Sequence, residues 1–400
     1  MEYKSMIAWS LNIRGQQPIG LDIGHNSIKM IQLVINDEQI SVIAADETRI
    51  DASINGDDQA RRSFIISAIK RMLANGGFQG RNVVSCLPSN KLRITSLRLA
   101  EAEKYGIERA LRKEVAHRFG LDPDKDSMDY MVAGSVRQGD EVKNELILFA
   151  VDNETIKNHI ATLEEAELKP VAIDTVPCAL FRSFERSLRR QEDRDRTNVF
   201  VDVGSYFTTV VFGRGGEISF IKQIQIGGQV FAREIAAKLG ISVSEADTLQ
   251  EALRVDPGLF SLKSGLAEQV AAENRRDVDT STRQVMVDAV SAVAEDLARE
   301  ISLCLRYYTV TFRGKRVERA VFAGGGAYED ILLNVLRRRL AVEIEVAQPL
   351  RGFDLSNGKI NVNFDNDRRG LFCEWAVAVG LSLKGWNRVK SSKHMARCES

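Results

Sequence analysis

The chain has 400 residues, of which 44% are hydrophobic and 28% are charged, and its 55 basic residues balance 55 acidic ones. This length is more than one ordinary domain needs, and the composition excludes disordered and collagen-like proteins. The zero net charge argues against a protein that binds nucleic acid over its whole surface.

The first half of the chain is predicted to alternate between strands and helices. A short apolar strand at Ile19–Ile23 is followed by two more, at Ile28–Ile35 and Gln39–Ala45, which indicates a meander rather than a βαβ unit. Apolar spacing then predicts a helix at Asp57–Ala74, strands at Val83–Leu87 and Leu92–Leu99, a helix at Glu103–Phe119, strands at Ser127–Val136 and Asn144–Asp152, a helix at Asn153–Ala166, a strand at Pro170–Asp174 and a helix at Pro177–Arg190.

The pattern restarts after the charged segment Arg189–Arg196, which is interpreted as a linker. Strands are again predicted as a meander, at Val199–Val203, Thr208–Phe212 and Glu217–Ile226. The later elements are predicted as helices at Gln229–Leu239, Val243–Leu253 and Arg283–Tyr308, a strand at Val317–Ala323, a glycine turn, a helix at Tyr328–Leu340, a strand at Val342–Val346 and a helix at Leu371–Leu383.

A nine-residue motif occurs twice. LDIGHNSIK at Leu21–Lys29 recurs as VDVGSYFTT at Val201–Thr209, displaced by 180 residues, and each copy lies between the first two strands of a meander. Two halves that begin alike indicate a duplicated domain. Clefts between domains are favoured ligand sites, so we expect a ligand between the two copies.

The shared Asp-x-Gly sequence suits a phosphate ligand. Glycine permits a sharp turn and a close backbone approach to an anion, successive N–H groups form a concave anion site, and hydroxyls add donors. Because carboxylates repel phosphate, Asp22 and Asp202 are predicted to hold Mg²⁺, partly through water. The alternative is a pair of structural hairpins without a ligand.

The segment Ala323–Ala327 contains three glycines between a strand and a helix. Glycine there would let a flat ring or a phosphate lie against bare backbone at a helix N-terminus. The alternative is a tight turn that needs a positive φ. The sequence contains no Walker A motif and no GxGxxG, which excludes the P-loop and dinucleotide-binding folds.

These three motifs, in this order, resemble the superfamily of actin-like and sugar-kinase ATPases. Within it, IGLDIGHNSIKMIQL, VDVGSYFTTVVF and RAVFAGGGAYEDILLNVLRRRLAVEIEVAQPL are similar to the PilM family of type IV pilus assembly proteins. The run NKLRITSLRLAEAEKYGIERALRKEVAHRFGLDPDKDSMDYMVAG resembles the inserted subdomain that this family shares with the division protein FtsA. The resemblance covers about residues 18–385.

The resemblance implies an α/β, two-lobed actin-like fold, which is a duplicated ribonuclease H-like architecture. Its expected parts are an N-terminal extension at 1–17, lobe 1 at 18–196 with a small inserted subdomain at about 102–151, lobe 2 at 197–385, and a basic C-terminal tail at 386–400.

It also implies a function and a set of site residues. The family's role would make the chain an ATP-binding cytoplasmic scaffold that captures the N-terminal tail of a PilN-like inner-membrane protein, with other pilus platform or motor proteins as further partners. The residues that correspond to the family's nucleotide site are Asp22, Gly24, His25, Asn26, Ser27, Lys29, Asp202, Gly204, Ser205, Thr208, Gly227, Gly228, Asp247, Gln250, Gly324, Gly325 and Gly326.

Three departures from the family pattern affect the expected chemistry, and one of them is that Tyr206 and Phe207 crowd the second turn, where small polar residues are usual. Asp247 and Gln250 replace the Glu and Lys of the family's AE-x-x-K motif, which is expected to weaken nucleotide binding. His25 stands where a small residue is usual. Only Asp174 and Thr175 could orient a water for attack on a phosphate, so we expect ATP binding with at most weak ATPase activity.

Two other functions fit the same superfamily. One is a small-molecule kinase or phosphatase, which would need a substrate site beside the nucleotide. The other is a filament-forming division protein of the FtsA type, which would pellet with ATP.

The cysteines and the hydropathy indicate the cellular compartment of the protein. Its five cysteines are isolated and form no CxxC pair, which fits a reducing compartment rather than a disulfide framework or a zinc site. No apolar run approaches the roughly 18 residues of a membrane span, and the N-terminus lacks a signal peptide's apolar region. We therefore expect a cytoplasmic protein that reaches the inner membrane through its partner.

Overall fold

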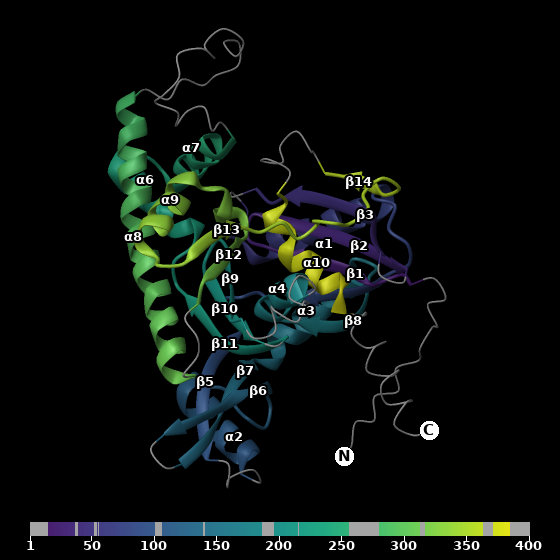
Figure 1. The fold of residues 1–400 in the computed structure, drawn as a ribbon. Helices are drawn as coiled ribbons and strands as arrows, with labels where there is room; N and C mark the ends of the chain where they lie inside the picture. The colour runs from purple at the N-terminus through teal and green to yellow at the C-terminus, as the bar shows by residue number, and fades with distance from the viewer. Residues whose placement is uncertain are drawn as a thin grey trace.

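The computed structural model of the protein describes residues 15–36, 39–51, 54, 56–100, 106–138, 141–185, 196–214, 216–255, 280–312, 317–362 and 371–384. The predicted C-terminal tail lies outside these residues, as do most of the predicted N-terminal extension and most of the predicted linker. The described part folds around three β-sheets (Figure 1).

The first sheet has the strand order β14-β3-β2-β1-β4-β8. β1 is antiparallel to β2 and parallel to β4. Side chains alternate along β4, so that Val83 packs with α1 and α3 while Val84 packs with α4 and α10 on the opposite face. The bounds are β1 (Ile19–Ile23), β2 (Ser27–Asn36), β3 (Gln39–Arg49), β4 (Asn82–Cys86), β8 (Lys169–Asp174), β14 (Lys359–Asn361), α1 (Asp58–Asn75), α3 (Asn153–Glu165), α4 (Val176–Glu185) and α10 (Ala376–Ser382).

The second sheet repeats this arrangement, with the order β11-β10-β9-β12-β13. β9 is antiparallel to β10 and parallel to β12, as β1 is to β2 and β4. The predicted duplication is therefore present in the topology as well as in the motif. The bounds are β9 (Asn198–Val203), β10 (Thr208–Arg214), β11 (Glu217–Ile224), β12 (Arg319–Ala323), β13 (Glu343–Val346), α6 (Gly228–Leu239), α7 (Val243–Val255), α8 (Thr280–Thr311) and α9 (Asp330–Arg339).

A third sheet, with the order β5-β7-β6, forms the inserted subdomain. Figure 1 shows it at the end of α8, and α2 covers one of its faces. The other face packs against the core of lobe 2 through residues such as Phe149. The bounds are β5 (Arg93–Ala100), α2 (Ile107–Phe119), β6 (Ser127–Gln138) and β7 (Glu141–Val151). β5 pairs with β7, so the subdomain begins at Arg93, before the expected start near residue 102.

A buried carboxylate fixes this subdomain to α8. Glu145 of β7 is 1% exposed and forms an ion pair with Arg98, with Nε and Oε2 2.8 Å apart. The Tyr307 hydroxyl of α8 donates to the other oxygen of Glu145 at 3.2 Å. Because a buried charge is costly unless it is paired, these contacts define how the subdomain docks.

The chain returns to lobe 1 after β13. β14 pairs in parallel with β3, and α10 packs on β1 and α4. These residues were expected in lobe 2, which the resemblance extended to residue 385. Sequence patterns missed β14 because Lys359–Asn361 has one apolar residue and obtains its strand conformation from pairing with Ala44–Asp46.

Most of the predicted elements are confirmed within a few residues. The largest shifts are in β3, which continues to Arg49 through Asp46 and Glu47, and in the second helix, which begins at Ile107 rather than Glu103. The predicted final helix divides into a 3-10 turn, η7 (Cys373–Trp375), and α10. None of the described helices is long and apolar enough to cross a membrane.

Candidate functional site

The two Asp-x-Gly hairpins have the same backbone geometry. The Gly24 N–H donates to the Ser27 carbonyl at 2.9 Å, and the Gly204 N–H donates to the Phe207 carbonyl at 3.0 Å. Asp22 pairs across its hairpin with Lys29, and Asp202 pairs with Thr209 at the equivalent position. The sequence repeat is therefore a structural repeat at the level of single hydrogen bonds.

Different groups hold the two turns in place. The Arg61 guanidinium of α1 donates to the carbonyls of Gly24 at 2.7 Å and His25 at 3.0 Å. In lobe 2, backbone N–H groups at the start of α6 donate to the Gly204 and Ser205 carbonyls, each at 2.9 Å. Both turns are thus anchored through their carbonyl oxygens.

Gly227 and Gly228, at the start of α6, lie close to the second hairpin. A Cβ at Gly227 would lie 2.6 Å from the carbonyl oxygens of Gly204 and Ser205, a distance that no side chain tolerates. Gly228 has ordinary space, with Ser205 Cα at 3.7 Å. Thr208 is fully buried, and its hydroxyl donates to the Ile226 carbonyl at 2.7 Å, just before these glycines. These residues hold α6 against the hairpin.

The glycine turn at Gly324–Gly326 also packs against the second hairpin, at Asp202 and Val203. Gly324 has φ 84°, and a Cβ there would lie 2.4 Å from Asp202 Oδ1. A Cβ at Gly326 would lie 2.3 Å from Val203 Cγ1. The positive φ that the sequence left as an alternative is present at Gly324, and the close packing brings this turn against the carboxylate of the second hairpin.

The two aspartates interact electrostatically. Burial raises the pKa of Asp202 to about 7, with a further contribution from the charge of Asp22 and an opposing one from Lys29. Burial also raises the pKa of Asp22, against the lowering effect of Lys29. The neighbouring charge that adds to the rise is Asp22 for Asp202 and Glu47 for Asp22, so the two aspartates belong to one buried acidic cluster whose carboxylates could hold a cation.

Lys29 brings a positive charge to the cluster of carboxylates around Asp22. It is 8% exposed, forms an ion pair with Glu47 at 3.3 Å and donates to Ser27 Oγ at 2.5 Å. Burial alone would lower its pKa, but the charges of Glu47, Glu374 and Asp22 together raise it, so the ammonium stays charged. Lys29 therefore neutralises part of the acidic cluster.

Glu374, which precedes α10, joins the glycine turn to this cluster. It accepts a hydrogen bond from the Tyr328 hydroxyl, at the end of η5 (Gly325–Tyr328). Burial raises the pKa of Glu374, and Lys29 opposes that shift. Sequence reasoning missed Glu47, Arg61 and Glu374, because none of them belongs to a motif, and it treated Tyr328 only as the first residue of the helix after the glycine turn.

The pair expected near a ribose lies on α7. Asp247 is half-buried, whereas Gln250 is 1% exposed and donates through Nε2 to Glu329 Oε2 at 3.3 Å. The Oε1 atom of Gln250 has no hydrogen-bond partner in the described structure. Gln250 thus contacts the segment that follows the glycine turn and retains an unused acceptor.

The hairpin tips touch each other between the lobes. The rings of His25 and Tyr206 have centroids 4.5 Å apart and planes at 61°. Burial and then the nearby Arg61 lower the pKa of His25 to about 4, so the imidazole is neutral at pH 7. A protonated His25 that donates to phosphate does not fit this environment.

The sequence pattern of the family described as "Type IV pilus assembly protein PilM" matches residues 20–256 and 265–386, which is most of the chain. The chain belongs to the PilM family.

Solved structures confirm the fold of this PilM-family chain. A structure described as "PilM-PilN type IV pilus biogenesis complex" matches with a TM-score of 0.67 and 20% identity, covering 92% of this chain and 98% of that one. The ethanolamine utilization protein EutJ from Carboxydothermus hydrogenoformans matches with a TM-score of 0.51 and 13% identity, covering 92% and 89%. The predicted two-lobed actin-like fold is confirmed.

Asp174, one of the two expected water-orienting residues, is already paired in this PilM-family chain. Its Oδ2 atom lies 2.9 Å from Arg182 Nη1 and 3.0 Å from Lys384 Nζ. The hydroxyl of Thr175, the other candidate, accepts from the Cys178 N–H at 3.4 Å. The Asp174 carboxylate is engaged by two cations and by the Thr175 N–H, so neither residue is well placed to orient a water.

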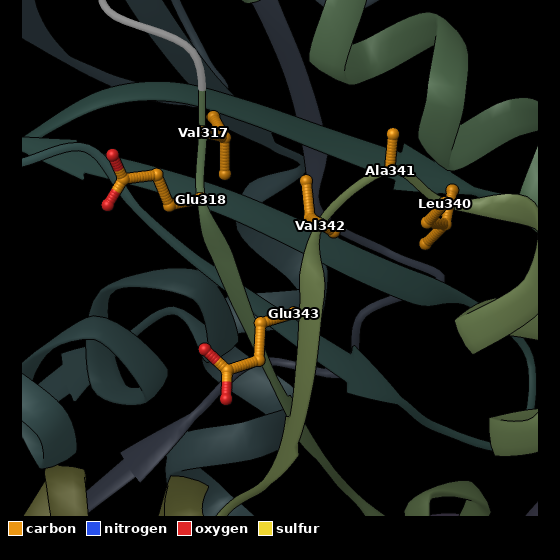
Figure 2. Close-up of a pocket in the computed structure, with 6 residues that line it drawn as sticks. All are labelled: Val317, Glu318, Leu340, Ala341, Val342 and Glu343. Atoms are coloured by element: carbon orange, nitrogen blue, oxygen red, sulfur yellow. The ribbon is translucent and has the colours of Figure 1, made fainter.

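Other candidate sites are less suitable. No group of three or more potential metal ligands occurs among the described residues. A hollow of about 540 Å³ lies at the N-terminal ends of β12 and β13 (Figure 2), at the opposite end of β12 from Gly324. In Figure 2, Glu318 and Glu343 point away from the apolar side chains of this hollow, so it presents no convergent polar groups. The hairpins remain the candidate site.

Proposed function

We propose that this PilM-family chain binds ATP with Mg²⁺ between its two Asp-x-Gly hairpins and acts as a cytoplasmic scaffold in type IV pilus assembly. The observation that most supports the proposal is the convergence of two equivalent hairpins and a glycine turn on Asp22 and Asp202. Family membership supports the assembly role.

Each part of the site would contact a different part of the nucleotide. The turn residues His25, Asn26 and Ser205 would surround the phosphates with backbone N–H groups, while the N–H groups of Gly24 and Gly204 close the two hairpins. The glycine turn at Gly324–Gly326 would lie against the adenosine, beside Asp247 and the unused Gln250 acceptor. Lys29 and Ser27, which already form a hydrogen bond, would supply charge and a donor.

Asp22 and Asp202 would hold the magnesium ion, partly through its water molecules. Two carboxylates with raised pKa values fit a cation that prefers one or two carboxylates together with phosphate oxygens. A bound magnesium ion would neutralise phosphate charge and hold the aspartates ionised.

The proposed partner is the N-terminal tail of a PilN-like inner-membrane protein. The similar solved structure is described as a complex of PilM with PilN. An extended tail would bind by strand addition or in apolar pockets, and would bring this scaffold to the inner membrane. Hydrolysis would be slow, because Asp174 is held by Arg182 and Lys384.

Calorimetry with Mg²⁺ and ATP tests the nucleotide site. We expect the wild type to bind and Asp22→Ala or Asp202→Ala to weaken binding by about tenfold or more, as loss of a charge-paired contact predicts. Asp288→Ala, at an exposed position of α8, should bind like the wild type. The absence of binding by a folded wild type would overturn the nucleotide site.

A second titration tests the scaffold role separately. Fluorescence anisotropy with a labelled PilN-like tail peptide should give saturable binding to the full chain. An identical signal with a scrambled peptide would refute specific capture of the tail.

A further inference from the structure

The contact between His25 and Tyr206 has a consequence for the ligand that the proposed nucleotide site can accept. Each ring belongs to the turn that follows an Asp-x-Gly motif, and the two turns are structurally equivalent. The rings therefore meet between the two turns that would surround the phosphates. Their centroid distance of 4.5 Å leaves no space for a phosphate group between them.

The backbones that carry the rings are anchored on both sides. Arg61 holds the carbonyls of Gly24 and His25, and the start of α6 holds those of Gly204 and Ser205. Gly227 allows this second contact to be close. The turns are thus fixed, and the side chains of His25 and Tyr206 are the parts that rotation can move apart.

The chemistry of the two rings suits side chains that block the space between the turns and can be pushed aside. It does not suit groups that bind a phosphate. At pH 7 the imidazole of His25 is neutral, so it provides no ionic attraction for a phosphate. Tyr206 is 41% exposed, which leaves its ring room to swing toward solvent. An edge contact between two rings contributes a modest stabilisation that a ligand can displace.

We propose that the His25–Tyr206 ring pair discriminates between nucleotides by phosphate number: a nucleoside diphosphate binds with the rings in contact, and a triphosphate has to separate them. The proposal rests on the proposed nucleotide site. It makes His25 and Tyr206 determinants of specificity, and it predicts that the wild type binds ADP more tightly than ATP.

Calorimetric titration of ADP and of ATP, each with Mg²⁺, tests the proposal on the full chain. Variants Tyr206→Ser and His25→Ser should bind ATP about threefold to tenfold more tightly than the wild type, the range expected for loss of one aromatic contact. The affinity of Tyr206→Ser for ADP should change by less than about twofold. Tyr130→Ser is the matched control, because Tyr130 of β6 is 42% exposed and lies in the inserted subdomain.

The outcomes separate the two proposals. A wild type that binds both nucleotides, with an affinity ratio that the two variants leave unchanged, would overturn the ring-pair proposal and keep the nucleotide site. Weaker ATP binding by Tyr206→Ser would also overturn it, since the ring would then be a ligand. If neither the wild type nor any variant binds a nucleotide, both proposals are refuted.

Discussion

The hairpin of lobe 1 and the hairpin of lobe 2 have the same turn but different supports. In lobe 1 a single side chain, Arg61, binds the turn carbonyls, and in lobe 2 the backbone of α6 does so. The aspartates differ as well, because Asp22 faces Lys29 across its hairpin whereas Asp202 faces Thr209. A duplicated motif can thus keep its geometry while the groups that stabilise it diverge.

The largest expected effect concerns the two aspartates and pH. Since the folded pKa of Asp202 is about 7, well above its ordinary value of 3.8, the folded state keeps a proton that the unfolded state loses. The stability that this provides is present at low pH and is lost as pH rises through 7. Asp202→Asn cannot ionise, so we expect it to exceed the wild type in unfolding free energy by several kcal/mol at pH 8, since each pKa unit is worth about 1.4 kcal/mol.

Urea unfolding between pH 5 and pH 8 measures this difference, which should shrink toward pH 5. Asp22→Asn should show a smaller pH dependence, because Lys29 partly neutralises Asp22. A stability gain of Asp202→Asn that is the same at both pH values would contradict the assignment.

The second prediction concerns a substitution that disrupts the contact between α6 and the hairpin of lobe 2. Gly227→Ala places a methyl group 2.6 Å from two carbonyl oxygens, so α6 and the turn have to separate. Overpacking of this kind is expected to cost about 3 kcal/mol of unfolding free energy. Gly228→Ala is the matched control, because its new Cβ would meet Ser205 Cα at an ordinary 3.7 Å. Equal melting temperatures for the two variants would show that the close approach is unimportant.

The third prediction concerns a substitution that removes the contact between Arg61 and the hairpin of lobe 1. Arg61→Ala removes two charge-assisted hydrogen bonds to the turn, which is expected to cost about 2 kcal/mol of unfolding free energy. Arg71→Ala, an exposed position on the same helix, should change it by less than about 0.5 kcal/mol. Chemical denaturation of the two variants measures this difference. Similar losses of unfolding free energy for Arg61→Ala and Arg71→Ala would refute a specific role for Arg61.

The sequence was sufficient for the repeating framework. Both meanders, the Asp-x-Gly turns and the glycine turn could be predicted because they depend on local patterns: alternating apolar residues, glycines and a motif that occurs twice. The expectation that Asp22 and Asp202 face each other followed from the repeat, since equivalent turns of two packed halves face each other, whereas the place of Gly324 beside them followed from the family resemblance.

The rest depends on contacts between residues far apart in the chain. Arg61 is one of several arginines on a helix, and nothing in its local sequence distinguishes it from Arg71. Glu374 reaches the site because the chain returns to lobe 1, and β14 forms only where β3 offers an edge. The contact between His25 and Tyr206 likewise requires the two lobes to be packed together.

The return of the chain to lobe 1 limits how the molecule can move. The chain passes from α4 in the first lobe to β9 in the second, and back again between β13 and β14. Two covalent crossings define a hinge axis, so the lobes can rotate about it but cannot slide freely past each other. A ligand that needs only the two rings to part would leave the lobes where they are, whereas one that needs the turns themselves to part would have to rotate one lobe about these crossings.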